Sequence, residues 1–294
     1  MKSITECQAL MKHLFFPSVF LALVFPLTAQ TKKDEPWSIN EATMFGMGGY
    51  NLEDTYLSPG KGVNYTGTGF RILNERMKMT HLADYTVSRQ QLLHLDLAST
   101  YNPAMTATDV AGFIDYSLGW HYRFRPADNL KVLAGASARG LLGFIYNTRN
   151  GNNPASVKAD ADLNLSAAAI YGWKIKNYPL TFRYQAEVPF VGVFFSPHYS
   201  QSYYEIFDLG NDDGVVQFNS FHNKFAMKNY LTVDFPVGVF TVRAGYLHSY
   251  YYTDVNNIRS HIISHTFLLG LVKEFVSFGG RRLKDNRKYR SAYY

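Results

Sequence analysis

The sequence predicts an all-β protein, an antiparallel transmembrane β-barrel of about ten strands that follows a cleaved signal peptide. Three observations predict this class. A short apolar segment stands near the N-terminus, polar and apolar residues alternate over most of the chain, and the segments that alternate are joined by short and long connections in turn. The composition agrees, because 22 Tyr and 22 Phe favour strands and a mean hydropathy of −0.17 is compatible with one polar strand face.

The apolar segment is a candidate signal peptide. The basic pair Lys12-His13 precedes the run from Leu14 to Leu27, and the small residue Ala29 follows. The run is too short to cross a bilayer with any margin, and two prolines within it argue against a buried helix. We therefore expect cleavage near Ala29 and export of the remainder.

The chain is expected to consist of three segments: a signal peptide over residues 1–29, an outer-membrane barrel over 30–278 and a basic C-terminal tail over 279–294. Most of the net charge of +6 lies in the tail, whose single acid, Asp285, is outnumbered by Arg281, Arg282, Lys284, Arg287, Lys288 and Arg290. An exported protein has little access to nucleic acid, so we interpret the tail as a solvated extension. The single cysteine, Cys7, precedes the apolar run, so the mature chain has no disulfide and no thiolate metal site.

The alternation has a period of two, as in a strand with one polar and one apolar face. In the clearest case, Val110 to Arg125, Leu118 and Trp120 belong to the apolar face, whereas Ser117 and His121 belong to the polar face. The other candidate strands are Met44–Leu52, Val63–Asn74, Arg89–Thr100, Leu130–Tyr146, Ala159–Trp173, Leu180–Val191, Phe221–Phe235, Phe240–Tyr252 and Ile262–Phe275. The segment Glu75–Ser88 is ambiguous, and two more strands there would raise the number to about twelve.

The connections favour a membrane barrel. Short ones occur at Pro126–Asn129, Lys176–Pro179 and Pro236–Gly238, and longer ones at Glu53–Gly62, Tyr101–Asp109, Asn147–Val157, Ser196–Ser220 and Asp254–His261. Short turns on one side, long loops on the other and aromatic residues at both strand ends are typical of outer-membrane barrels. The alternative is a soluble periplasmic lipocalin-like binding barrel, whose apolar strand faces would point inward.

If the apolar faces contact lipid, the opposite faces line the interior. The charged residues expected there are Asp96, Asp115, His121, Arg123, Arg139, Asp160, Asp162, Arg183, Glu187, Lys224, Lys228 and Arg243. Both signs are present, and a barrel of about ten strands is narrow. The sequence leaves two interpretations open: structural ion pairs across the interior, or a small pore or proton path.

The long connection Ser196–Ser220 supplies the other candidate site. His198 and Ser200 would share one face of an extended chain, with the hydroxyl near the imidazole. This pair resembles the His-x-Ser pair of outer-membrane phospholipases, with Asn211 as a candidate third residue. The non-catalytic interpretation is an ordinary surface loop in which Tyr199, Tyr203 and Tyr204 offer binding contacts. Asn211-Asp212-Asp213-Gly214 is an ordinary turn sequence, so we expect no metal and no cofactor.

Several stretches carry a resemblance to a known family. They are Asp54–Pro59, Gly143–Pro154, Phe195-Ser196-Pro197 and Gln201–Phe207. They resemble an uncharacterised family of Bacteroides-type cell-envelope proteins, a domain of unknown function. The resemblance implies export and an envelope location for most of the mature chain. It implies no activity and no functional residues.

These observations favour a non-enzymatic outer-membrane barrel with a structural, ligand-binding or minor transport role. Its expected partners are outer-membrane lipid and an extracellular small molecule or glycan, with no nucleic acid. The alternative from a different class is an outer-membrane hydrolase that uses His198 and Ser200.

Overall fold

The computed structural model describes residues 37–58, 63–176, 178–237, 240–275, 290–291 and 293–294. The predicted signal peptide and most of the predicted tail lie outside these residues. The chain divides into two units, and every described residue belongs to the second, Glu35–Tyr294.

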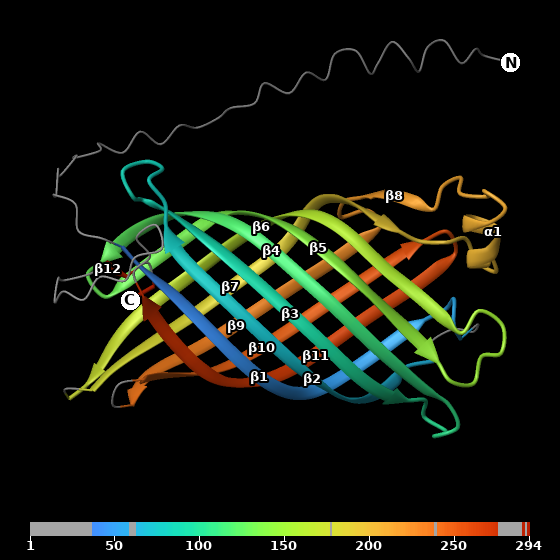
Figure 1. Cartoon of the computed structure of the whole chain (residues 1–294), viewed down its shortest axis with the longest axis horizontal. Coiled ribbons are helices and arrows are strands. Elements are labelled where there is room, and N and C mark those ends of the chain that lie inside the picture. Colours follow the sequence, from blue (N-terminus) through green and yellow to red (C-terminus); the bar gives the residue numbers. More distant parts are fainter. Residues whose placement is uncertain (1–36, 59–62, 177, 238–239, 276–289, 292) are drawn as a thin grey trace, which may run out of the picture. The chain divides into compact units, whose positions relative to one another are not determined.

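Ten long antiparallel strands form this unit (Figure 1). They are β1 (Trp37–Asp54), β2 (Tyr65–Met79), β3 (Val87–Tyr101), β4 (Thr108–Ala127), β5 (Leu130–Asn147), β6 (Ala155–Ile175), β7 (Tyr178–Phe195), β9 (Lys224–Val237), β10 (Phe240–Val255) and β11 (Ile258–Phe275). Each pairs with its neighbours along the chain, and β11 pairs back onto β1 from Ile39↔Phe275 to Asp54↔Ser260. The sheet therefore closes on itself, which confirms the predicted barrel and its strand number.

The ambiguous segment Glu75–Ser88 contains no additional strands in the structure. Glu75 to Met79 ends β2, residues 80–86 turn, and β3 begins at Val87. The turn includes left-handed backbone at Ala83, Asp84 and Tyr85. The twelve-strand alternative is therefore wrong for this segment.

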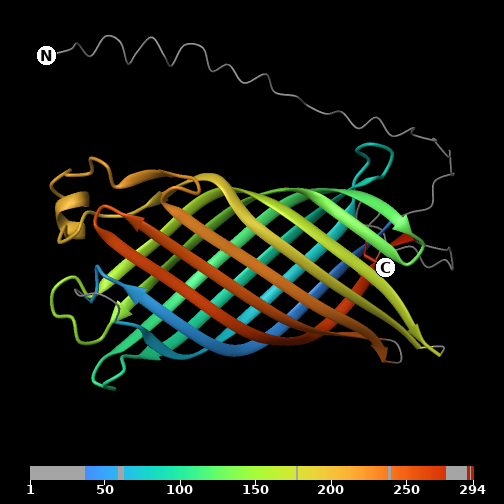
Figure 2. The same ribbon diagram turned by 180° about the vertical axis from the view of Figure 1, so that it is seen from behind.

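Three small elements complete the described fold. The helix α1 (Tyr203–Phe207) and the strand β8 (Val216–Asn219), which pairs with β7, lie within the connection between β7 and β9. The strand β12 (Arg290–Ser291) pairs in parallel with the start of β1. Figure 2 shows α1 and the longer loops gathered at one end of the barrel, which we call the loop end.

Nine of the ten strands are longer than the alternation predicts; β6, for example, has 21 residues. The exception is β9, which begins at Lys224 because residues 221–223 of the predicted strand form a turn. The pattern marks only the part of a strand with one apolar face, whereas backbone pairing continues where both faces are polar. One predicted long connection, Asp254–His261, is wrong for the same reason. β10 and β11 extend through it and meet at a two-residue turn, Asn256-Asn257. Both asparagines have left-handed backbone, at φ 54° and 60°, as a tight hairpin requires.

The side chains on the outer wall are mostly apolar, whereas those inside the barrel are both polar and apolar. Exposed side chains include Phe45, Leu165 and Phe267, whereas their chain neighbours Met44, Ser166 and Leu268 are buried. A buried apolar cluster inside the barrel joins Met44, Leu73, Leu92, Tyr230, Leu247 and Leu268. A soluble barrel would expose polar side chains on its outer wall, so this distribution is the reverse of the lipocalin-like alternative.

Candidate functional site

The predicted interior charges lie inside the barrel. Asp115, His121, Arg183, Glu187, Lys224 and Arg243 are all buried, and Arg123 is partly exposed near the short-turn end. Arg123 donates a hydrogen bond to the carbonyl oxygen of Tyr85. His121 Nε2 lies 2.9 Å from Ser166 Oγ, and Glu187 accepts hydrogen bonds from Ser137 and Asn164.

One group of polar residues connects strands from opposite sides of the barrel. We call it the Glu75 network: Glu75, Gln90, Arg183, Gln185, Asp234 and Arg243. Glu75 of β2 forms ion pairs with Arg183 of β7 and with Arg243 of β10, the latter at 2.8 Å. Four strands separate β2 from β7 in either direction around the sheet, so the Glu75–Arg183 contact crosses the full interior.

The other members of the Glu75 network add further hydrogen bonds, although Arg183 Nε is buried with no hydrogen-bond partner among the described residues. Asp234 accepts two hydrogen bonds of 2.7 Å from Arg243, in the bidentate geometry that favours arginine. Gln90 of β3 and Gln185 of β7 exchange hydrogen bonds of 2.9 Å across the barrel. Both arginines and Glu75 are essentially fully buried.

A second group lies nearer the loop end. We call it the Asp115 network: Asp115, Arg139, Asp160, Asp162, Lys224 and Lys228. Arg139 contacts Asp115 at 2.7 Å and Asp162 at 3.0 Å, and Lys228 of β9 reaches Asp115 of β4 at 2.7 Å. Lys224 lies 3.0 Å from Asp160 and 2.8 Å from Asp162. Opposite charges therefore meet across the interior at a second level.

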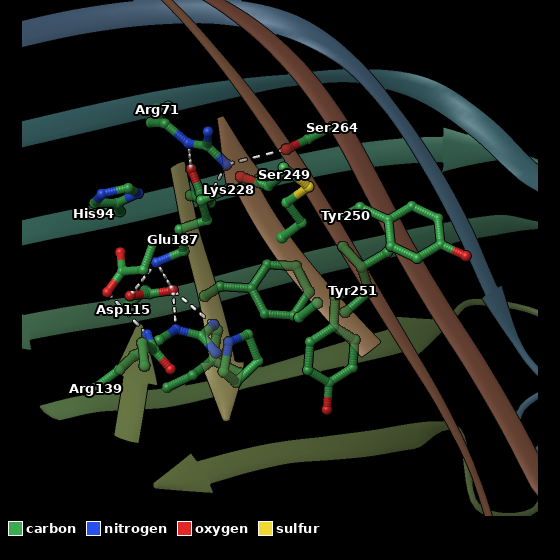
Figure 3. Close-up of a pocket in the computed structure, with 18 of the residues that line it drawn as sticks. Arg71, His94, Asp115, Arg139, Glu187, Lys228, Ser249, Tyr250, Tyr251 and Ser264 are labelled. Atoms are coloured by element: carbon green, nitrogen blue, oxygen red, sulfur yellow. Dashed lines mark hydrogen bonds and ion pairs between the residues drawn. The ribbon is translucent and has the colours of Figure 1, made fainter. Parts of the chain in front are cut away.

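A small cavity of about 60 Å³ borders the Asp115 network (Figure 3). Arg71 and His94 line it, and Arg71 pairs with Asp96 on one side. Among the described residues, Arg71 Nη1 and His94 Nε2 are buried with no hydrogen-bond partner. A space of this size holds only a few water molecules, which would satisfy these atoms but would not let a solute pass.

The last two residues enter the barrel from the short-turn end, although the sequence suggested a solvated tail. Tyr293 is fully buried, and its ring lies 4.2 Å from the Arg243 guanidinium carbon. Its hydroxyl lies 2.9 Å from Thr232 Oγ1, and the Tyr294 hydroxyl donates to Asp234 at 2.7 Å. An aromatic ring over a buried guanidinium is a favourable contact. The prediction of a solvated tail rests on its basic residues and does not take the two terminal tyrosines into account.

The structure does not bring His198 and Ser200 together as the hydrolase alternative requires. The chain turns here, and Ser200 has left-handed backbone at φ 68°, so the two side chains do not share an extended face. His198 Nε2 lies 3.1 Å from the Asp213 carbonyl oxygen. The Asn211 backbone N–H donates to the Glu205 carbonyl, and the Asn211 carbonyl accepts from the Gln201 side-chain amide. Hydrolase activity stays a prediction without a geometric basis in this loop.

The three loop tyrosines have different surroundings. Tyr203, Phe195 and Phe207 pack together, with each pair of ring centroids 6.3 Å apart, and the Tyr203 hydroxyl accepts a 2.7 Å hydrogen bond from the Val157 backbone. Burial raises the pKa of Tyr203 to about 12, so its hydroxyl is protonated at neutral pH. Tyr204 is exposed on α1, and Tyr199 is exposed beside a cup in the loop end.

The cup has a volume of about 490 Å³ and is lined mainly by Asn, Tyr and Ser side chains. Its floor is fixed by two asparagines. Asn147 donates to Tyr65 and Asp109, and Asn150 donates to the carbonyl oxygens of Leu57 and Asn153. Tyr199, Ser200, Asn152 and Arg149 form other parts of its wall. The cup thus joins all the longer loops at this end.

Two features are absent from the described residues. No group of three or more His, Cys, Asp or Glu side chains among them is arranged to hold a metal ion. Within the same part of the chain, no helix is both long and apolar enough to cross a membrane.

Sequence reasoning missed several members of the interior networks, above all Glu75 and Asp234. Glu75 faces the interior, but its neighbours Asn74 and Arg76 on the outward face are also polar. Because both faces are polar here, the alternation of polar and apolar residues cannot be recognised. Asp234 lies inside the predicted strand Phe221–Phe235, on the same face as Lys224 and Lys228, and is fully buried in the structure. Continuing the alternation past Asn74 would have found Glu75, and following it along the whole predicted strand would have found Asp234.

These features define a closed ten-stranded antiparallel barrel whose interior is filled by buried side chains and whose loops form an open cup. The chain belongs to the family described as a protein of unknown function, DUF3316, whose model matches residues 16–282. Among curated proteins, none matches this chain.

Three solved structures are similar to it. The transport unit of the autotransporter AIDA-I from Escherichia coli has 11% identity, a TM-score of 0.42 and coverage of 87% of this chain and 94% of that chain. An outer membrane channel from Pseudomonas putida F1 has 9% identity, a TM-score of 0.35 and coverage of 85% and 100%. The translocator domain of the autotransporter NalP from Neisseria meningitidis has 11% identity, a TM-score of 0.33 and coverage of 82% and 90%. These likenesses are too distant to carry a functional argument, so the fold rests on the strand pairing.

The Glu75 network gives a testable prediction about stability. Glu75→Gln keeps the side-chain shape but leaves Arg183 and Arg243 without their shared negative charge. We expect a loss of about 3–5 kcal/mol in the free energy of unfolding, measured by urea titration of the folded protein in detergent. The control is Asp254→Asn, which removes an exposed pair with Arg259 and should cost below about 1 kcal/mol. Equal losses for the two variants would contradict a buried, interdependent network.

Proposed function

We propose that this protein is an outer-membrane barrel that is closed to solute diffusion and binds an extracellular molecule at its loop end. The observation that carries the proposal is the contact between Glu75 and Arg183, because it joins opposite walls of the barrel through the middle of the interior. The export and envelope location implied by the family resemblance belong to the same proposal.

The outer wall supports placement in a membrane. The exposed residues on its strands include Leu163, Leu165 and Leu269, and water would hydrate such a band unfavourably. Aromatic side chains mark two levels of the wall, with Phe144 and Tyr146 near the loop end and Tyr171 and Trp173 near the short turns. Strands of 14 to 21 residues exceed the roughly 9–11 needed to cross a bilayer at a tilt.

The membrane placement is tested by two leucines of matched exposure. Leu165 in β6 and Leu209 after α1 are 56% and 57% exposed. Leu165→Arg should cost roughly 2–4 kcal/mol of barrel stability in lipid vesicles, because arginine would face hydrocarbon. Leu209→Arg should have little effect, because it lies in a loop. The readout is the folded fraction by heat-modifiable gel mobility, and equal tolerance of both variants would refute the membrane placement.

The closed interior is tested by conductance. The full chain reconstituted in planar lipid bilayers should give no steady channel current, because two ion-pair networks, an apolar cluster and Tyr293 occupy the interior. Reconstitution is checked by protease protection of the same preparation. Stable ohmic steps from inserted wild-type protein would overturn the proposal and favour the pore interpretation.

The cup supports the binding part of the proposal. Its volume suits a small ligand, and its wall combines an exposed tyrosine ring with amide and guanidinium groups. An aromatic ring stacks on the apolar face of a sugar, and amides hydrogen-bond to sugar hydroxyls. The cup therefore favours a saccharide over a purely apolar ligand, and we propose a neutral saccharide as its ligand.

We expect Tyr199→Ala to weaken binding of a neutral oligosaccharide such as maltoheptaose or cellohexaose by roughly three- to tenfold, because the stacking ring is lost. Binding is followed by intrinsic fluorescence of the folded protein. Tyr204→Ala is the matched control, since Tyr204 is exposed in the same connection but does not line the cup. Absence of binding to a panel of neutral oligosaccharides, or equal losses in the two variants, would refute the saccharide assignment.

A further inference from the structure

A groove of about 580 Å³ lies on the outer wall where β10, β11 and β1 run side by side. Its apolar part is made by Phe45, Val242, Leu269 and Leu271. In the strand register Leu271 stands between Val242 and Thr43, and Leu269 stands opposite Phe45. The groove is deepest at Thr43, whose side chain is small, and beside Gly270, which has no side chain. The groove is thus a hollow in a surface that we place in lipid.

The short-turn end of the groove carries two opposite charges. Glu41 and Lys273 both line it and stand directly opposite each other in the β1–β11 pairing. Such cross-strand pairs ordinarily form ion pairs. Among the described residues, however, neither Glu41 nor Lys273 has an ion-pair or hydrogen-bond partner. Arg76 of β2 stands opposite Glu41 on its other side. A carboxylate and an ammonium are therefore both presented at one end of an apolar hollow.

The spacing fits a membrane lipid. Glu41 and Phe45 are four residues apart on β1, which corresponds to about 13 Å along the strand and, at a tilt of about 45°, to roughly 9 Å along the membrane normal. Half of a bilayer's hydrocarbon core is about 15 Å thick. If the short turns face the periplasm, the charged pair stands near the headgroup level of the periplasmic leaflet, and Phe45 lies towards the middle of the bilayer.

We propose that this groove binds a zwitterionic glycerophospholipid of the phosphatidylethanolamine class, an inference that rests on the proposed membrane location. The lipid phosphate pairs with the Lys273 ammonium, and the lipid amine donates hydrogen bonds to the Glu41 carboxylate. One acyl chain lies over Leu269, Leu271 and Phe45. A phospholipid with a phosphate but no amine brings a net negative charge beside the Glu41 carboxylate and offers it no ammonium, which leaves Glu41 with the charge of Arg76 across the β1–β2 pairing. The site therefore selects the zwitterionic headgroup over an anionic one.

The test uses native mass spectrometry of the full chain in mild detergent, titrated with palmitoyl-oleoyl phosphatidylethanolamine or palmitoyl-oleoyl phosphatidylglycerol. The wild-type protein should retain phosphatidylethanolamine preferentially. The double variant Glu41→Gln with Lys273→Gln should bind it roughly tenfold more weakly, because charge-assisted hydrogen bonds are lost. Lys174→Gln is the matched control, since Lys174 is an exposed lysine at the end of β6, away from the groove.

A second variant tests the hollow independently of the charges. Thr43→Trp fills the groove and should reduce retention of both phospholipids while leaving Glu41 and Lys273 in place. Equal binding of the two lipids by wild-type protein, or wild-type affinity in both the double variant and Thr43→Trp, would overturn the lipid site. Heat-modifiable gel mobility of each sample shows whether the variant is folded. Failure of the proposed membrane location is seen separately, as recovery of the wild-type protein without detergent.

Discussion

Closure of the sheet between β1 and β11 is the constraint on which the other features depend. It gives every long strand two hydrogen-bonded neighbours, so neither edge of the sheet is left with unpaired backbone groups. It also divides the side chains of each strand into two sets. One set points at the outer environment, and the other is confined with the inward side chains of nine other strands. The apolar wall and the crowded interior both follow from this division.

The interior shows how a narrow barrel accommodates many charges. Burying an ion is costly unless an opposite charge and further hydrogen bonds replace its water. Glu75 meets this condition with two arginines and Gln90, and Asp115 meets it with Arg139 and Lys228. Because these contacts join distant strands, they also hold the barrel's cross-section in one arrangement. The same groups that make the interior polar also fill it, which is why we propose that binding takes place at the loops and the outer wall.

The loops and the wall offer two different binding environments. At the loop end, hydrogen bonds from Asn147 and Asn150 hold the connections in place, so the cup exists before any ligand arrives. Preformed sites lose less entropy on binding. On the wall, the hollow beside Leu271 and the opposed charges of Glu41 and Lys273 belong to regular strands. Both sites are formed by residues that are distant in sequence and adjacent only because the sheet closes.

The sequence by itself determined the barrel class and the side of the strand on which residues such as Asp115 and Arg183 lie, because a period of two is a local property of each strand. It predicted about ten strands and left twelve open, and only the structure of Glu75–Ser88 decided between them. The sequence did not determine which charges meet. Glu75 and Arg183 are separated by more than a hundred residues, and their contact depends on strand number and register around the whole sheet. The separation of His198 from Ser200, the turn at Asn256 and the burial of Tyr293 were likewise decided by tertiary structure. Each depends on backbone conformation or on partners from other strands, which alternation along one strand does not encode.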